Sequence, residues 1–314
     1  MAFFCHGWKG IEEMSEEIMN RELGEDSGDE VGTLYLVATP LGNREDMSPR
    51  AARILEQVAY VAAEDTRTAA RLLSELGVGN RLISYYEQNQ HARHEMFLRD
   101  LHAGRSIAVI SEAGMPCISD PGEGIVRLAV EHSIPISVIP GPSAFVSAVA
   151  ASGFDTRHFV YSGFIPARGR DRRMLIKEIA AERRTIVFYE APHRIEKTFR
   201  DLVEADLGAR RIVIARELTK RYEEFIRLTV AEAVAYYETV TPRGEFTIVL
   251  EGAAEYEART GDRDARSDEE LIELLRNCLD EGMTTREAAA DVAAETGESK
   301  NKLYQLALSV KETR

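Results

Sequence analysis

Short apolar runs alternate with amphipathic stretches from residue 33 to residue 151, and this alternation predicts strands separated by helices. The apolar runs lie at 33–38, 58–63, 81–84, 106–111 and 136–139. The amphipathic stretches lie at 49–57, 66–76, 91–102, 122–132 and 143–151. Strands separated by helices in this way are typical of a mostly parallel sheet that is covered on both faces. We therefore predict an α/β domain over residues 31–153.

A second α/β domain is predicted over residues 154–252. Strands are expected at 159–161, 185–189, 211–215, 224–228 and 246–250, with helices at 172–181 and 192–204. Some of these connections are too short for a parallel crossover, so a mixed strand order is expected in this sheet.

The two ends of the chain have a different character. Residues 1–30 hold nine acidic and two basic residues without a clean hydrophobic period, which predicts a disordered acidic tail. Residues 253–266 are rich in Gly, Asp, Arg and Glu and are expected to form a linker. Capping boxes begin at Ser267 and Thr284, and Ser299 opens a further helix. These signals predict a small helical domain over 267–314.

Charge is distributed unevenly along the chain. The formal net charge is -14, yet residues 157–221 hold 16 basic and 9 acidic residues. The acidic excess lies at the two ends and the basic excess lies in the second domain, so the net charge is a poor guide to partners.

The cysteines and the apolar runs bear on location. Three cysteines lie far apart in the sequence, which argues against a disulfide framework and favours a reducing compartment. No run approaches the ~18 apolar residues of a membrane span. We expect a cytoplasmic protein that does not bind membranes. No ligand cluster has metal spacing, so no metal is expected.

Two loops at predicted strand ends have the composition of ligand-binding segments. ATPLGN (38–43) follows the first strand, and its Pro and Gly let a ligand approach the backbone. SEAGMPCISDPG (111–122) follows the fourth strand and carries two carboxylates. Ligands of open α/β sheets bind beyond the carboxyl ends of strands. Since GxGxxG and GxxxxGK[ST] motifs are absent here, dinucleotide and P-loop functions lose their main support.

Four further segments combine polar groups at strand ends or helix starts. PGPSA (140–144) leads into a helix whose free N–H groups can contact a ligand. AEDTR (63–67), YEAPHR (189–194) and ARELTK (215–220) are charged exits from three strands. Each one alone is also compatible with a capped helix start or a surface ion pair. Together they predict one cleft between two sheets.

Arginines are concentrated just after the first strand of the second domain. Arg168, Arg170, Arg172 and Arg173 lie within six residues, close after Tyr161 and Phe164. Arginine binds phosphate through paired donors, and aromatic rings stack on unpaired bases. The cluster therefore predicts RNA binding, with a solvated helix face as the alternative.

These segments together resemble the tetrapyrrole methylase family, in particular its class III branch that methylates a cytidine 2′-hydroxyl in 16S ribosomal RNA. The resemblance runs from about residue 32 to residue 252. It rests on ATPLGN, AEDTR, SEAGMPCISDPG, PGPSA, GFIPARGRDRR, FYEAPHR, ARELTK and RGEFTIVLEG in that order. It implies two α/β domains with S-adenosylmethionine in the cleft between them, a homodimer, and the small ribosomal subunit as partner.

The resemblance and the charged strand exits together indicate which residues form the site. The cofactor pocket is expected to include Pro40, Ser111, Glu112, Met115, Ser143, Ala144 and Glu190, with Leu218 and Thr219 near the adenine. Catalytic roles are expected among Glu64, Asp65, Arg67, Glu190 and Lys220. RNA contacts are expected from Arg168, Arg170, Arg172, Arg173 and Arg194.

Two positions in the cofactor loop depart from the family pattern. Glu112 stands where the family usually has Asp, and Met115 where it usually has Thr. Two alternatives therefore stay open. One is methylation of a tetrapyrrole, whose carboxylates the arginines would also suit. The other is a non-catalytic RNA-binding ribosome assembly factor that keeps a vestigial pocket.

Overall fold

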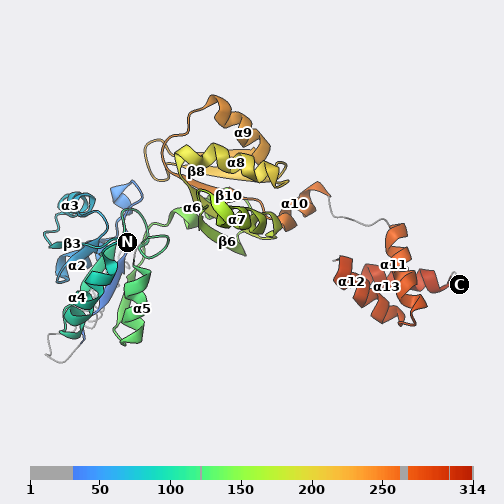
Figure 1. The fold of residues 1–314 in the computed structure, drawn as a ribbon, viewed down its shortest axis with the longest axis horizontal. Helices are drawn as coiled ribbons and strands as arrows, with labels where there is room; N and C mark the ends of the chain where they lie inside the picture. The colour runs from blue at the N-terminus through green and yellow to red at the C-terminus, as the bar shows by residue number, and fades with distance from the viewer. Residues whose placement is uncertain (1–30, 121, 262–267, 297, 313–314) are drawn as a thin grey trace, which may run out of the picture.

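A computed structural model of the chain describes residues 31–120, 122–261, 268–296 and 298–312 (Figure 1). The tail expected at 1–30 and the capping box expected at Ser267 lie outside the described residues.

The first sheet has five parallel strands in the order β3-β2-β4-β1-β5. The strands are β1 (Leu34–Val37), β2 (Val61–Ala63), β3 (Leu82–Ser84), β4 (Ile107–Ile110) and β5 (Ile136–Ile139). Strand β1 lies between β4 and β5, so that its residue Leu36 is beside Val109 on one side and Val138 on the other. The parallel order predicted from the alternating pattern is confirmed.

Helices cover both faces of this sheet, because successive side chains of a strand point to opposite faces. Tyr35 and Val37 pack with α2 (Pro49–Gln57) and α3 (Thr66–Glu75). Leu34 and Leu36 pack with α4 (Gln90–His102) and α5 (Glu123–Glu131). A short 3-10 helix, η1 (Arg44–Asp46), follows the β1 exit loop. The strands β1, β2 and β4 are therefore buried on both sides, whereas the edge strand β5 is partly exposed.

The second sheet has the order β6-β7-β10-β8-β9 and is mixed, as predicted. Its strands are β6 (Phe159–Phe164), β7 (Thr185–Glu190), β8 (Arg211–Arg216), β9 (Glu224–Thr229) and β10 (Phe246–Leu250). Only β6 and β7 pair in parallel, and the other pairs are antiparallel.

One face of the second sheet is covered by helices from its own domain. These are α7 (Gly169–Ala181), α8 (Ile195–Glu204), which follows the 3-10 helix η2 (Pro192–Arg194), and α9 (Val230–Thr239). The expected elements did not include α9, although Thr229 and Glu232 form a capping box at its start.

The opposite face is covered by α6 (Ala144–Ser152), which the sequence assigned to the first domain. Ala148 and Val149 of α6 pack with Val187, Val213 and Val249 of the second sheet. Leu41 of the first domain joins the same cluster. The expected boundary at residues 153 and 154 is therefore misplaced for α6, because its apolar face is buried on the second sheet.

The linker expected at 253–266 begins instead with a helix, α10 (Ala253–Thr260). Arg259 donates to Glu251 at 2.9 Å, and Glu255 accepts from Arg211 at 2.7 Å. The charged composition that resembled a linker is used in ion pairs that hold α10 against the sheet.

The last described residues form three helices: α11 (Asp268–Asp280), α12 (Thr285–Thr296) and α13 (Lys300–Glu312). They bury a separate apolar cluster that includes Leu271, Leu275, Val292 and Leu303. The capping box at Thr284 is present, since Glu287 accepts from the Thr284 backbone at 2.8 Å. None of the described helices has the length and apolar character of a membrane span.

Arg172 is buried under α7 and does not face solvent. Its side chain donates to Asp201 at 2.5 Å, to the Pro166 carbonyl at 2.9 Å and to Thr198 at 3.0 Å. With 3% of its surface exposed, it has no open face for a phosphate. The prediction that Arg172 binds RNA therefore does not fit the structure, in which it fastens α7 to α8.

Replacing Arg172→Ala should destabilise the protein by about 2–4 kcal/mol, because it removes three hydrogen bonds of a buried guanidinium and its ion pair with Asp201. The neighbouring exposed Arg173→Ala should change stability by less than about 0.5 kcal/mol. Urea unfolding of both variants measures the difference. Equal stability would contradict the role given to Arg172.

Candidate active site in the cleft between the sheets

The carboxyl ends of β1 and β4 meet the start of α6, the end of β7 and the start of β10 around an interdomain cavity of about 390 Å³. Its lining comes from both domains. The residues are Leu41, Glu64, Glu112, Ala113, Gly114, Met115, Ile118, Ser119, Asp120, Ser143, Ala144, Phe145, Phe164, Tyr189, Glu190, Ala191, Pro192, Gly244, Glu245, Phe246 and Thr247. Glu64, Glu112, Met115, Ser143, Ala144 and Glu190 were named from the sequence.

Two loops hold the domains together beside this cavity. The Asn43 backbone donates to the Thr219 hydroxyl at 3.2 Å. Gly42 lies so close to Lys220 that an added Cβ would be 2.3 Å from the lysine Cγ. The β1 exit loop therefore needs glycine at 42 to approach the loop after β8.

The loop after β4 is fixed by hydrogen bonds to the β1 exit. Thr39 and Gly114 exchange backbone hydrogen bonds at 2.9 and 3.0 Å. The Ser111 hydroxyl donates to the Gly114 carbonyl at 3.0 Å. Ser111 is thus buried and shapes the loop, while Glu112 is exposed and lines the interdomain cavity.

An aromatic wall follows the start of α6. Phe145 stacks on Tyr161 with ring centroids 4.5 Å apart, and Tyr189 meets Tyr161 edge-on at 5.4 Å. The Tyr161 and Ser119 hydroxyls are 2.6 Å apart, which joins this wall to the loop after β4. The Ser143 side chain makes no capping hydrogen bond to α6.

Glu190 is a buried carboxylate at the cavity wall, with 2% of its surface exposed. It pairs with Arg194 at 2.7 Å and accepts from the Thr198 hydroxyl at 2.6 Å. It also accepts from the Ala191 backbone at 2.9 Å. Glu190 therefore shapes the wall, and Arg194 serves as its partner.

Asp120 lines the cavity and was not named from the sequence. Burial raises its pKa to about 6, and the charges of Glu64 and Glu112 add to the rise. Burial also raises the pKa of Glu64, with further contributions from Glu112, Asp65 and Glu87. The carboxylate-bearing loop at 111–122 was the available signal for Asp120. This end of the cavity favours a cation.

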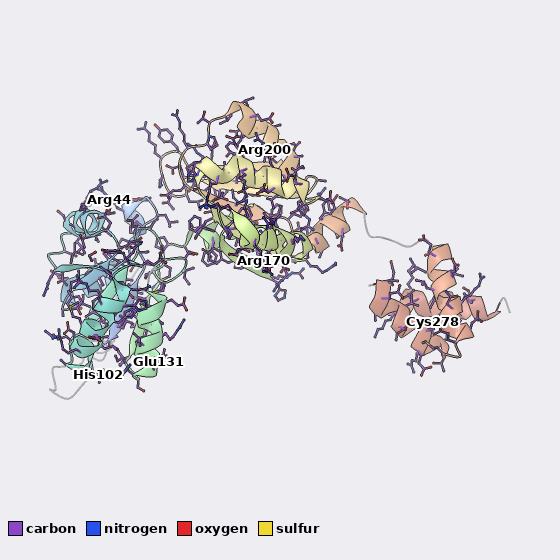
Figure 2. All side chains as sticks on the ribbon, in the orientation of Figure 1. Arg44, His102, Glu131, Arg170, Arg200 and Cys278 are labelled. Carbon is purple, nitrogen blue, oxygen red and sulfur yellow. The ribbon has the colours of Figure 1, made fainter. Side chains whose placement is uncertain are left out.

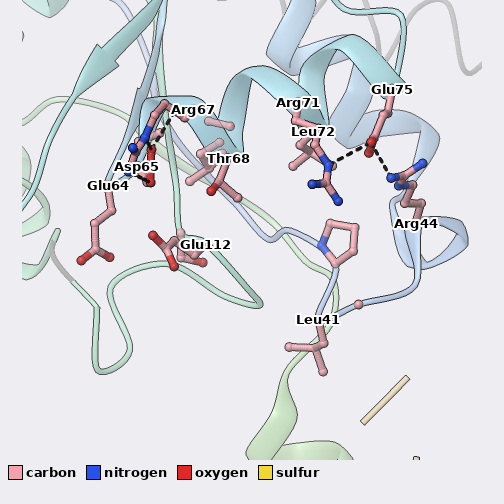
Figure 3. A pocket seen from close by; sticks show the side chains of 16 residues that line it. Leu41, Arg44, Glu64, Asp65, Arg67, Thr68, Arg71, Leu72, Glu75 and Glu112 are labelled. Carbon is pink, nitrogen blue, oxygen red and sulfur yellow. Dashed lines mark hydrogen bonds and ion pairs between the residues drawn. The ribbon is translucent and has the colours of Figure 1, made fainter. Parts of the chain in front are cut away.

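A second hollow, the first-domain cavity of about 650 Å³, lies beside the first (Figure 3). It is lined by Pro40, Leu41, Gly42, Arg44, Ala63, Glu64, Asp65, Arg67, Thr68, Ala69, Arg71, Leu72, Glu75, Ile110, Ser111 and Glu112. Pro40, Asp65, Arg67 and Ser111, which the sequence predicted for one cleft, line this hollow.

Ion pairs arrange the arginines of the first-domain cavity. Arg67 donates to Asp65 at 3.2 and 2.9 Å and lowers the pKa of that carboxyl to about 2. Arg44 and Arg71 share one carboxylate, that of Glu75. One guanidinium charge at this end therefore has no counter-charge of its own.

Leu218, Thr219 and Lys220 lie outside the linings of these two cavities. Leu218 is buried against α6 in the core of the second sheet. Thr219 lines a small hollow of about 360 Å³ next to Ser143. The Lys220 ammonium lies 3.0 Å from both Glu217 and Glu245. Burial alone would lower the pKa of Lys220, but hydrogen bonds to these two carboxylates raise it. 

Arg168, Arg170 and Arg173 are exposed at the start of α7 and form an arginine patch, and Arg170 is labelled in Figure 2. Within the described part of the chain, no group of three or more His, Cys, Asp and Glu is arranged to hold a metal ion.

Family models match most of the chain. Residues 33–234 match the model of tetrapyrrole (corrin/porphyrin) methylases, and residues 265–311 match that of the RsmI C-terminal HTH domain. Ribosomal RNA small subunit methyltransferase I of Synechocystis sp. is 43% identical over 281 residues, which cover 89% of this chain and 99% of that protein. The protein of that name from Thermotoga maritima is 44% identical over 222 residues, covering 71% and 99%.

Solved structures share the fold at low identity. The methyltransferase CobJ has a TM-score of 0.55 at 17% identity, covering 71% of this chain and 95% of that one. Uroporphyrin III C-methyl transferase from Thermus thermophilus has a TM-score of 0.52 at 19% identity, covering 73% and 100%. The two-domain α/β fold predicted from the sequence is confirmed.

Replacing Asp120→Asn should stabilise the free protein at pH 7.5 by about 1–2 kcal/mol. This is less than the full pKa shift corresponds to, because Asp120 is partly exposed and solvent screens its charge. The pKa of Asp120 in the folded protein, about 6, lies above the ordinary aspartate value of 3.8. Stability is therefore lost as pH rises from about 4 to 6, and the variant lacks this loss. Urea unfolding across this range measures it, with exposed Glu131→Gln as control. A variant that retains the full wild-type pH dependence would contradict the assignment.

Proposed function

Because this chain belongs to the tetrapyrrole methylase family and is a methyltransferase, we propose that it methylates a cytidine 2′-hydroxyl of 16S ribosomal RNA with S-adenosylmethionine as donor. The observation that carries the proposal is the interdomain cavity, where loops distant in sequence place carboxylates, the α6 N-terminus and aromatic rings around one space.

The interdomain cavity suits the donor in size and charge. Its volume of about 390 Å³ falls in the range of small-ligand sites, roughly 300–1,000 Å³. Asp120, Glu64 and Glu112 provide negative charge for a sulfonium, and Phe145, Phe164 and Tyr189 provide apolar surface for an adenine. The bound donor supplies an activated methyl group, so the protein's task is to position the acceptor and remove a proton.

Glu64 is the proton acceptor that fits best among the predicted candidates. Asp65 is a weak base because Arg67 lowers its pKa, and Lys220 stays protonated between two carboxylates. Glu190 is already occupied by Arg194 and Thr198. Glu64 has a raised pKa and is exposed at the cavity mouth. As the new carbon–oxygen bond forms and the carbon–sulfur bond breaks, Glu64 accepts the hydroxyl proton and passes it to water.

The curated relatives favour ribosomal RNA over the tetrapyrrole alternative. Proteins named ribosomal RNA small subunit methyltransferase I match this chain at 43–44% identity, whereas the tetrapyrrole enzymes share only the fold. A ribosomal RNA substrate implies a cytoplasmic location. The homodimer suggested by the family remains part of this proposal. Val138 on the edge strand β5 and Val146 on α6 are exposed apolar side chains that a second copy would cover.

The test is methyl transfer from labelled S-adenosylmethionine to small ribosomal subunits purified from a strain that lacks the corresponding enzyme. We expect label in the RNA at an alkali-resistant linkage, because a methylated 2′-oxygen cannot attack the adjacent phosphate. Glu64→Gln should lower kcat by roughly 10²–10⁴-fold, as expected for loss of a general base. Glu131→Gln serves as the matched control. Transfer to a tetrapyrrole, or no transfer by the wild type, would refute the proposal.

Neutralising the arginine patch with Arg170→Gln and Arg173→Gln together should weaken RNA binding and flatten its salt dependence. Each lost phosphate contact on a single strand reduces the slope of log K against log salt by about 0.7. Arg200→Gln is the control, since Arg200 is exposed on α8 and paired with Glu196 (Figure 2). Fluorescence anisotropy over a salt series measures RNA binding. Equal slopes for the double variant and the Arg200→Gln control would show that the patch does not contact RNA.

A further inference from the structure

The first-domain cavity adjoins the interdomain cavity. Both are lined by Leu41, Glu64 and Glu112, so these three side chains form the boundary between them. Methyl transfer requires the acceptor oxygen to lie in line with the methyl carbon at near contact distance. With the donor in one cavity, the adjoining cavity is the place from which an acceptor reaches the methyl group.

One face of α3 is dedicated to this cavity. Thr68, Arg71, Leu72 and Glu75 line it at the spacing of neighbours along a helix face. Leu73 of the same helix points into the core of the first sheet. The helix thus buries one side and offers another, polar side to a ligand.

Charge is separated along the cavity. Figure 3 shows Glu64 and Glu112 at one end, and Arg71 and Arg44 with Glu75 at the other. The side chain of Arg44 is 58% exposed and that of Arg71 is 79% exposed, so both guanidinium groups at this end are accessible. Carboxylates accept hydrogen bonds from hydroxyls, and guanidinium groups bind phosphate in paired fashion.

The wall between these ends is apolar and lacks aromatic rings. Pro40, Leu41, Leu72 and Ile110 provide it, and the described lining residues include no aromatic side chain. A base held by stacking would need rings. The cavity is therefore suited to a ribose and its phosphate, as presented by a nucleotide turned out of a single-stranded segment.

From these features we propose that the first-domain cavity seats the acceptor nucleotide of the RNA, with its ribose at Glu64 and Glu112 and its phosphate at Arg71 and Arg44. The inference rests on the proposed function and names where its substrate binds. The arginine patch on α7 then holds more distant parts of the RNA.

Filling the cavity is the sharpest test. Thr68→Trp places a ring in the space from an exposed position of α3, whereas Ala70→Trp places the same ring on an exposed position of α3 outside the cavity lining. Thr68→Trp should lower kcat/KM for small subunits by about 10²-fold through displacement of the acceptor. Ala70→Trp should stay within about twofold of wild type. Calorimetry with S-adenosylmethionine should give an unchanged Kd for both variants.

Binding of a labelled cytidine-containing oligoribonucleotide, with S-adenosylhomocysteine present, separates this inference from the proposed function. If the wild type methylates RNA and Thr68→Trp does so equally well, the cavity assignment is overturned and the function stands. If the wild type binds RNA without methylating it and Thr68→Trp loses that binding, the cavity assignment stands and the function fails. Weakened donor binding in Thr68→Trp would also overturn the assignment of separate cavities.

A second variant addresses the phosphate end. Arg71→Gln should reduce the salt slope of oligoribonucleotide binding by about 0.7, the value for one phosphate contact on a single strand. Arg53→Gln is the control, because Arg53 is exposed on α2 and lines neither cavity. An unchanged slope for Arg71→Gln would overturn the phosphate contact.

Discussion

The contact between the loop after β1 and the loop after β8 is the constraint on which both cavities depend. Gly42 packs against the Lys220 stem, and Asn43 donates to Thr219. Glu217 and Thr219 have φ angles of 52° and 64°, in the left-handed region that favours glycine. The ion pair of Lys220 with Glu217 helps to hold this backbone. Strain in the second domain is thus retained where the two domains touch.

The distribution of charge within the site, and not the net charge of the chain, is what bears on ligand binding. The chain carries a formal charge of -14, but the site separates its charges in space. Glu64, Glu112 and Asp120 line the cavity that we propose for the cationic donor, and desolvation keeps the pKa of Asp120 high in the free protein. Arg71 and Arg44 lie at the opposite end of the first-domain cavity, where we propose that the anionic RNA backbone binds. Complementary charge of this kind favours correct orientation as well as binding.

Strand ends and their loops were predictable from the sequence, because apolar runs and Gly or Pro punctuation are local signals. Glu64, Glu112 and Ser143 were located this way, and they line the cavities. The partners of charged residues were not predictable, since they lie far apart in the chain. Arg172 was predicted from the sequence to belong to a basic surface, but hydrogen bonds to Asp201 and Thr198 keep its side chain buried. The helix at 253–260 was missed because its stabilising partners are Arg211 on β8 and Glu251 directly after β10.

The misread arginine also explains how the arginine patch is positioned. Arg172 and Glu190 share Thr198: the guanidinium donates to its hydroxyl, and the hydroxyl donates to the carboxylate. This chain of contacts joins the start of α7, where Arg170 and Arg173 are exposed, to the wall of the interdomain cavity. Buried polar networks with every member paired are rigid. If RNA binds the patch as proposed, this network gives it a defined position relative to the proposed donor site, although the two surfaces come from different elements.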